Sequence, residues 1–268
     1  WTHASTMAAP DRRSRILWTG FGPFGAPEGR IAANPTTTLV EEIARRFAGD
    51  SCRVLEVSMA ACDAAIEGGQ ADLSTMSADS SFEACVHLGL ATDAVNVTLE
   101  RCAHNETTFR CPDERGAQPS TTPIDPTRPT ELRTRLDVDA LASSLRARGF
   151  DRVAVSDDPG RFVCNYLYFR SLAARRSDKT LFVHVPPFDR LDQATQLATL
   201  EALREEMLLA AADGGPTDSA AADHPPEQDQ QQSHEPKAAV HLRSNHDADE
   251  AAFSRDASQG SSLVEALV

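Results

Sequence analysis

Cys164 is the residue of this chain whose position best suits nucleophilic chemistry. It follows a short apolar strand pattern and a turn at residues 157–160, and it opens a pattern that predicts a helix. Unpaired N–H groups and the positive end of the dipole at a helix N-terminus favour a thiolate over a thiol. Because the thiolate is the reactive form of cysteine, Cys164 is a candidate nucleophile. Taken alone, a buried helix cysteine is an equally good interpretation.

A histidine base and an acidic partner are the other groups that such a nucleophile needs. His87, His104 and His184 lie in the part of the chain that we expect to fold. His184 sits in an apolar run, where a lone histidine is more often a core residue than a catalyst. Glu100 ends a strand pattern, and a glutamate is most commonly an exposed charge. The sequence alone assigns neither a role, because catalytic partners are adjacent only in the fold.

The glycine-rich segment GFGPFG at residues 20–25 suggests a different chemistry. It follows a predicted strand and fits the G-x-G-x-x-G pattern of dinucleotide-binding loops. Pro23 removes a backbone N–H that such a loop needs as a phosphate donor. Residues 26–34 contain Pro27 and Gly29, so the loop does not lead directly into a helix, and no acidic residue ends a second strand at the expected spacing. A nucleotide-binding oxidoreductase is therefore a disfavoured alternative.

Strand and helix patterns alternate along most of the chain. This alternation predicts an α/β fold, with a three-layer α/β/α sandwich around a mostly parallel twisted sheet. Sites in such folds lie at the carboxyl ends of the strands, where the glycine-rich loop, residues 156–164 and His184 fall. Strands are expected at residues 15–19, 51–59, 84–88, 95–99, 152–156 and 181–185, and helices at 36–47, 141–148, 162–174 and 193–212.

Composition divides the chain into one domain and two appendages. We expect residues 15–212 to form a single domain, with a long loop from 105 to 129, and residues 1–14 to be a flexible extension. Residues 213–268 hold 11 acidic and 3 basic residues among Gln, Ser, Pro and Ala. This composition predicts an acidic, low-complexity, disordered tail.

Charge and cysteine usage limit the classes of partner. The formal net charge of −14 argues against nucleic-acid and anionic-membrane binding. The sequence has no run of 18 apolar residues that would predict a membrane span, and its first residues lack a secretory signal. We therefore expect a cytoplasmic protein. Its true start is expected at Met7 or upstream of Trp1. The six cysteines match no zinc-binding spacing and are expected to be free thiols: Cys52, Cys62, Cys85, Cys102, Cys111 and Cys164.

Four segments narrow the function further. They occur in this order: GFGPFG at 20–25 with Asn34-Pro35, GLATDAVNVTLERCAHN at 89–105, SDDPGRFVCN at 156–165 and LFVHVP at 181–186. Together they resemble the signature segments of the pyroglutamyl peptidase I family, also called pyrrolidone-carboxylate peptidase. The resemblance covers about residues 15–212, and the run at 98–102 with Asn105 looks most like eukaryotic-type members.

The resemblance implies a cysteine exopeptidase that removes an N-terminal pyroglutamyl residue from peptides. In that family, the residues matching Cys164, His184 and Glu100 are the nucleophile, its base and the group that orients the base. The reaction passes through a thioester and needs no metal or cofactor. The implied partners are N-terminally pyroglutamylated peptides, with no nucleic acid and no membrane, and a monomer is favoured for a eukaryotic-type member.

The resemblance also implies a flat apolar slot for the neutral lactam ring of the substrate. Phe24 is the preferred ring contact, and backbone N–H groups at Cys164 and the adjoining turn are candidate oxyanion donors. The substrate-binding residues implied are Phe21, Phe24, Gly89, Leu90 and Phe162.

Four positions depart from the family pattern. Asp93 and Ala94 stand where many bacterial members have Gly-Arg, and Asp157 and Pro159 replace a usual asparagine and alanine. Ala94 and Pro159 keep a second alternative open, a catalytically impaired homologue that binds pyroglutamyl peptides, although the presence of all three catalytic residue types disfavours it.

Overall fold

The computed structural model describes residues 16–25, 27–67, 82–175 and 177–212. The expected extension at 1–14 and the acidic tail at 213–268 lie outside the described residues. Within the described ranges, no helix combines the length and apolar character that a membrane span requires.

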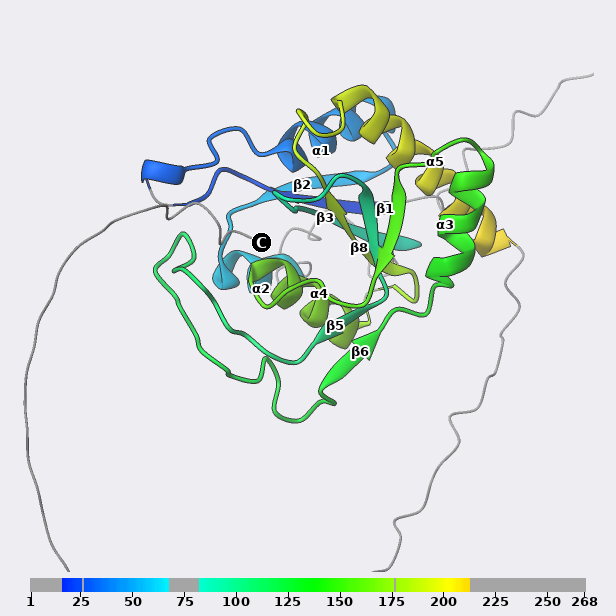
Figure 1. Ribbon diagram of the computed structural model, residues 1–268. Coiled ribbons are helices and arrows are strands. Elements are labelled where there is room, and N and C mark those ends of the chain that lie inside the picture. Colours follow the sequence, from blue (N-terminus) through cyan, green and yellow to red (C-terminus); the bar gives the residue numbers. More distant parts are fainter. Residues whose placement is uncertain (1–15, 26, 68–81, 176, 213–268) are drawn as a thin grey trace, which may run out of the picture. The chain divides into compact units, whose positions relative to one another are not determined.

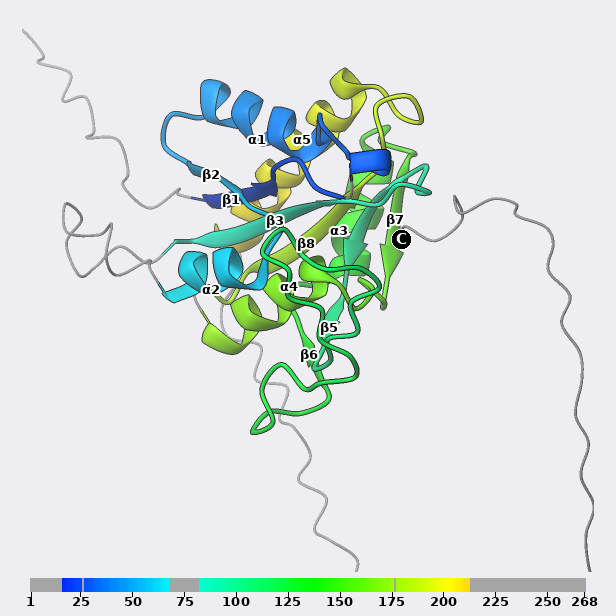
Figure 2. The same cartoon turned by 90° about the vertical axis from the view of Figure 1, so that its left-hand side faces the viewer.

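Six strands form one twisted sheet in the order β2–β1–β3–β8–β4–β7 (Figure 1, Figure 2). Neighbouring strands pair in parallel, except that β4 runs antiparallel to β8. The mostly parallel sheet predicted from the sequence is thus confirmed. The strands are β1 Ile16–Phe21, β2 Ser51–Leu55, β3 Ala84–Leu90, β4 Val97–Glu100, β7 Val153–Ser156 and β8 Thr180–Val185.

Helices cover both faces of the sheet, which confirms the α/β/α sandwich (Figure 1). One apolar core lies between the sheet and α1 Pro35–Arg46, α3 Val138–Ala147 and α5 Gln193–Ala212. A second core lies under α2 Met59–Glu67 and α4 Val163–Ala174. The side of the sheet covered by α2 and α4 carries the predicted catalytic residues.

Two parts of the fold differ from the sequence-based expectation. The strand predicted over residues 51–59 ends at Leu55, because Ser58 accepts a hydrogen bond from the Ala61 N–H at 3.1 Å and starts α2. The other difference is a two-stranded antiparallel ribbon of β5 Cys102–His104 and β6 Glu131–Arg133. Strands of three residues are too short to give a recognisable alternation.

The glycine-rich loop is fastened to the start of α1. Asn34 caps this helix by accepting a hydrogen bond from the Thr36 N–H at 3.1 Å, and its amide donates to the Gly22 carbonyl at 3.0 Å. A Cβ at Gly20 would lie 2.7 Å from the Thr36 carbonyl oxygen, so glycine permits this close approach. The loop continues into the short turn Pro27–Gly29 rather than directly into a helix, as the sequence indicated.

Candidate active site

His184 and Glu100 meet because β4 and β8 are antiparallel neighbours. Thr98 pairs directly with His184, so Glu100, two residues farther along β4, lies on the same face of the sheet. The Oε1 atom of Glu100 lies 2.8 Å from Nδ1 of His184. The glutamate therefore accepts the Nδ1–H of the ring and fixes which nitrogen is left for chemistry.

Glu100 is held in a buried position. Its residue is 2% exposed, and the Tyr168 hydroxyl donates to its backbone carbonyl at 2.9 Å. Among the described residues, its Oε2 atom has no hydrogen-bonding partner. A buried carboxylate with so few partners favours a positive charge on His184 beside it.

Cys164 lies at the start of α4, the helix that packs on the face of the sheet carrying Phe182 and His184. It is the second residue of that helix. The N-cap residue of the helix, Phe162, provides no side-chain hydrogen bond to the first turn. Cys164 is the second hydrogen-bonding partner of the His184 side chain. Because Nδ1 is taken by Glu100, Nε2 is the ring nitrogen left for the sulfur. The structure thus brings together the three residues expected to form the catalytic group.

The electrostatics of this group favour a proton on the imidazole. Burial opposes a charge on His184, but hydrogen bonds to Cys164 and Glu100, together with their negative charges, outweigh it and raise the pKa of His184 to about 10. At neutral pH the His184 ring is therefore protonated, which places a positive charge beside the Cys164 sulfur.

Gly89 lets the sulfur reach the sheet. It pairs with His184 in the β3–β8 register, and a Cβ here would lie 2.8 Å from Cys164 Sγ and 2.7 Å from the Phe182 ring. The Phe182 ring also packs against the His184 ring, with centroids 4.9 Å apart. Phe182 was not among the residues predicted from the sequence, although its position two residues before His184 in a strand places both side chains on one face.

The other two histidines of the folded part have different roles. Both ring nitrogens of His87 lie 2.8 Å from hydroxyl oxygens, those of Thr19 and Ser171. Burial lowers the pKa of His87 to about 3, so this ring is a neutral core group. His104 lies on β5, in the ribbon beside the sheet.

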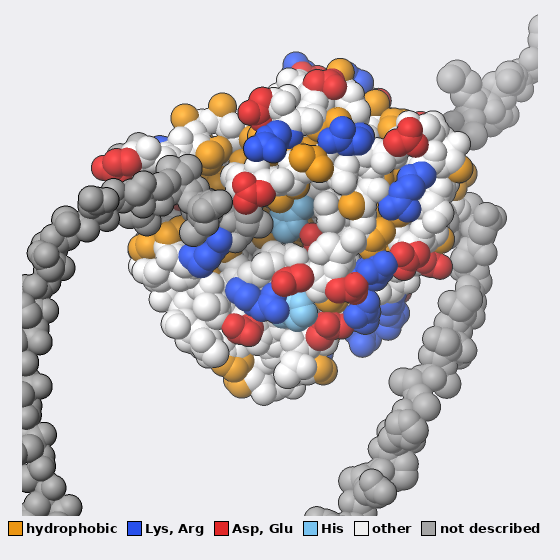
Figure 3. Space-filling model, in the orientation of Figure 1, with side chains coloured by type: hydrophobic (Ala, Val, Ile, Leu, Met, Phe, Trp, Pro, Cys, Tyr) orange, Lys and Arg blue, Asp and Glu red, His pale blue; other side chains and the backbone are white. Residues whose placement is uncertain are grey.

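The residues expected to bind substrate fall into two environments. Phe21 is 3% exposed and packs in the core, whereas Phe24, Leu90 and Phe162 are half-buried. Phe162 packs against Phe109, with ring centroids 4.7 Å apart, and Phe109 comes from the long loop, where no sequence pattern indicated it. Figure 3 shows that the face drawn there is hollowed, with a histidine side chain inside the hollow and charged groups of both signs around it.

The long loop is tied to the glycine-rich loop. Glu114 accepts a hydrogen bond from the Gly25 N–H at 2.9 Å, and its second oxygen pairs with Arg30 at 2.9 Å. These contacts fix the segment that carries Phe24.

The turn before Cys164 is anchored by charges. Asp157, which stands where asparagine is usual, pairs with Arg101 at 2.6 Å and with Arg133 at 2.7 Å. Next to Cys164, the Asn165 amide accepts from the His104 N–H and donates to the His104 carbonyl, both at 2.8 Å. The aspartate at position 157 thus has its own cationic partners.

Comparison with known proteins agrees with the geometry. The family model described as pyroglutamyl peptidase matches residues 14–208. Pyroglutamyl-peptidase 1 of Rattus norvegicus is 31% identical over 198 residues, which cover 73% of this chain and 90% of the rat protein. Pyrrolidone-carboxylate peptidase of Thermococcus litoralis is 31% identical over 179 residues, covering 64% of this chain and 76% of that protein.

Solved structures of the same kind share the fold. Pyrrolidone carboxyl peptidase from Thermococcus litoralis superimposes with a TM-score of 0.64 and 27% identity, covering 74% of this chain and 94% of that one. Pyrrolidone carboxyl peptidase from Thermus thermophilus superimposes with a TM-score of 0.59 and 29% identity, covering 72% of this chain and 99% of that one. These similarities decide against the nucleotide-binding oxidoreductase. The chain belongs to the pyroglutamyl peptidase family.

Proposed function

We propose that this protein is a cysteine exopeptidase that hydrolyses the amide bond after an N-terminal pyroglutamyl residue, with Cys164 as nucleophile, His184 as base and Glu100 as the residue that orients the base. The observation that carries the assignment is the position of the His184 ring, bonded to Glu100 through Nδ1 at 2.8 Å and to Cys164 on its other side. Family membership supports the reaction type.

Acylation begins from the ion pair between the Cys164 thiolate and the His184 imidazolium. The Cys164 sulfur attacks the pyroglutamyl carbonyl carbon, a C–S bond forms, and the carbonyl electron pair moves to oxygen. N–H groups of the first turn of α4 and the preceding turn stabilise that oxyanion. The His184 imidazolium then gives its proton to the leaving amine nitrogen, the C–N bond breaks, and a thioester remains.

Deacylation returns the enzyme to its starting state. Neutral His184 takes a proton from water as the water oxygen attacks the thioester carbonyl. The C–S bond breaks, free pyroglutamate leaves, and sulfur and imidazolium are again paired. Glu100 keeps Nδ1 protonated throughout, so that Nε2 is the atom that exchanges the proton.

The recognition site is the apolar slot beside the sulfur. A lactam ring carries no free amine, so it needs flat apolar walls and a few hydrogen bonds rather than a countercharge. Half-buried Phe24 and Phe162 are the ring contacts that we favour, with backbone groups of Gly89 and Leu90 at the end of β3. Buried Phe21 supports the loop from beneath.

The assignment is tested by release of a fluorophore from a pyroglutamyl amide. We compare wild type, Cys164→Ala and Cys111→Ser, a control that removes a partly exposed thiol not assigned to the site. Activity in wild type and in Cys111→Ser, with none in Cys164→Ala, is expected. Activity that persists in Cys164→Ala would contradict the nucleophile. A folded but inactive wild type would favour the peptide-binding homologue instead.

The boundaries and setting of the enzyme form a second part of the proposal. We expect residues 15–212 to suffice for activity, as the family match over 14–208 supports, with the acidic tail as a solvated appendage in a cytoplasmic monomer. A chain truncated after residue 212 should keep its kcat/KM and elute as a monomer. Loss of activity on truncation would assign the tail a role.

A further inference from the structure

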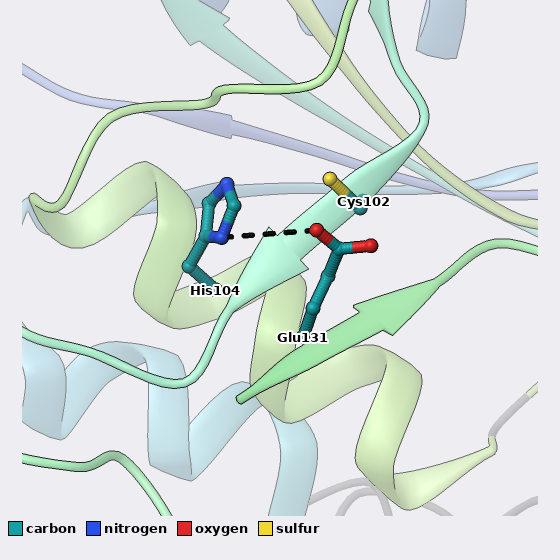
Figure 4. Close-up of side chains that lie close together, drawn as sticks. All are labelled: Cys102, His104 and Glu131. Carbon is teal, nitrogen blue, oxygen red and sulfur yellow. Dashed lines mark ion pairs between the residues drawn. The ribbon is translucent and has the colours of Figure 1, made fainter. Parts of the chain in front are cut away.

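A second group of cysteine, histidine and glutamate side chains lies on the β5–β6 ribbon. His104 and Glu131 are directly paired across the two strands, and Cys102 stands two residues before His104 on β5. The side chains therefore share one face of the ribbon, as Figure 4 shows. One ligand atom from each residue lies within 4.8 Å of the other two.

The hydrogen bonds around this group leave potential metal-ligand atoms of His104 and Glu131 facing each other. Nε2 of His104 lies 3.0 Å from the Asp157 carbonyl oxygen, so this nitrogen carries the proton. Nδ1 then presents a lone pair to Oε2 of Glu131, at 4.0 Å. That distance is too long for a hydrogen bond.

The neighbouring groups act as supports for these ligands. Histidines that bind metals usually donate their other ring N–H to a carbonyl or carboxylate, as His104 does here. Arg133 donates to Oε1 of Glu131 at 2.7 Å and so holds this carboxylate in place. Cys102 is fully buried, and its thiol donates a hydrogen bond to the Asp157 carbonyl oxygen at 3.1 Å, which a bound metal ion would replace.

The donor set and its dimensions suit a borderline cation. Thiolate, imidazole and carboxylate are the ligands of zinc sites, and two of them bound to one tetrahedral ion lie about 3.3–3.6 Å apart. The 4.0 Å gap between His104 and Glu131 needs only a small side-chain adjustment to reach that spacing. We propose that Cys102, His104 and Glu131 bind a zinc-like divalent cation, with water as the fourth ligand.

The ion would act on structure rather than on the peptide bond. None of its three ligands belongs to the catalytic group, and binding releases the Cys102 thiol proton to solvent. The ion clamps β5 to β6. Asn165, which follows Cys164 on α4, forms hydrogen bonds with the backbone N–H and carbonyl of His104. An ion that holds β5 against β6 therefore also stabilises the position of the start of α4.

Cobalt binding tests the site directly. We use the full chain with Cys164→Ala, which removes the catalytic sulfur as a competing ligand, and titrate Co²⁺ while recording the thiolate-to-cobalt charge-transfer and d–d absorption. One equivalent should give a thiolate band with tetrahedral d–d absorption, and Zn²⁺ should displace it. Adding Cys111→Ser should change nothing.

Two ligand variants in that background decide the assignment. Cys102→Ser should abolish the thiolate band. Glu131→Gln, at a half-exposed position that folding tolerates, should weaken cobalt binding at least about tenfold, since even changes to outer partners of a metal cost 10–100-fold. A band that survives Cys102→Ser, or an unchanged affinity in Glu131→Gln, would overturn the site.

Thermal unfolding gives a readout independent of spectra and of activity. Zn²⁺ should raise the melting temperature of the Cys164→Ala protein, because an ion that binds only the folded state stabilises it. The rise should be smaller in Glu131→Gln. An equal rise in both proteins, or none in either, would contradict the proposal.

Discussion

The described part of the chain holds two sets of cysteine, histidine and glutamate that differ in how their members are joined. In the set that we propose to be catalytic, Glu100 contacts the His184 ring at 2.8 Å, and Cys164 is the ring's other partner. On the ribbon, His104 and Glu131 stand 4.0 Å apart, and a backbone carbonyl holds the far ring nitrogen. The same residue types thus form a hydrogen-bonded acid–base group in one place and a looser set of candidate metal ligands in the other.

The difference teaches that hydrogen bonding, not residue type, decides what such a set can do. Burial opposes a charge on the His184 ring, but Cys164 and then Glu100 stabilise it and raise the pKa of His184 to about 10. On the ribbon, burial first and then the nearby Glu131 carboxylate raise the pKa of Cys102 to about 12. Cys102 is therefore a protonated, unreactive thiol unless a metal displaces its proton.

Removing each sulfur in turn is the strongest way to separate the two sets. Cys164→Ala should lower kcat/KM for a pyroglutamyl amide by at least about 10⁴-fold, because the covalent step is lost. Cys102→Ser should leave the reaction chemistry intact. Steady-state kinetics of both variants checks the contrast, and equal losses would mean that the two sets are not functionally distinct.

The two glutamates give the next largest contrast. Glu100→Gln should lower kcat by about 10²- to 10⁴-fold with little change in KM, because an amide can present a donor to Nδ1 and favour the wrong tautomer. Glu131→Gln should have no comparable effect on kcat. A mild effect of Glu100→Gln would show that His184 is oriented by its packing alone.

Gly89 tests how closely the catalytic sulfur must be placed. Gly89→Ala puts a Cβ 2.8 Å from Sγ of Cys164 and 2.7 Å from the Phe182 ring, so one of them must move. A displacement of about 1 Å at a reacting atom can cost about 10²-fold in rate. We expect that loss in kcat with the fold retained, as judged by circular dichroism. Unchanged kcat would show that the Phe182 ring alone gives way.

The pH dependence of kcat/KM is the smallest of the expected effects, and it tests the raised pKa of His184. His184 must be protonated to serve the leaving amine, so kcat/KM should stay high through neutral pH and fall about tenfold per unit above a limb near pH 10. The same raised pKa stabilises the fold below the unfolded value of about 6.5, and that contribution disappears as the pH rises through about 10. A falling limb near pH 7 would mean that Cys164 and Glu100 do not stabilise the imidazolium.

Much of the fold was predictable because its parts have strong local patterns. The buried strands β1, β3 and β8 are apolar runs, and α5 occupies the predicted range 193–212. The antiparallel placement of β4 between β8 and β7 was not predictable, because an alternating pattern does not reveal which strands are neighbours. That placement is what brings Glu100 to His184.

The site was predictable only in part for the same reason. The residues 100, 164 and 184 were found through segments that resemble a family, not through spacing. Phe109 has no pattern that marks it. The ribbon ligands stand at 102, 104 and 131, across a long loop, so their spacing matches no zinc template. Their proximity arises only when β5 and β6 pair.

Alkylation by iodoacetamide, followed by peptide mapping and activity, tests the central claim most directly. Cys164 should be modified in proportion to the loss of pyroglutamyl amide hydrolysis, because its sulfur lies at the start of α4 beside the positively charged His184 ring. Buried Cys102, with its raised pKa, should stay unmodified over the same period. Full activity in protein whose Cys164 is completely alkylated would contradict the mechanism.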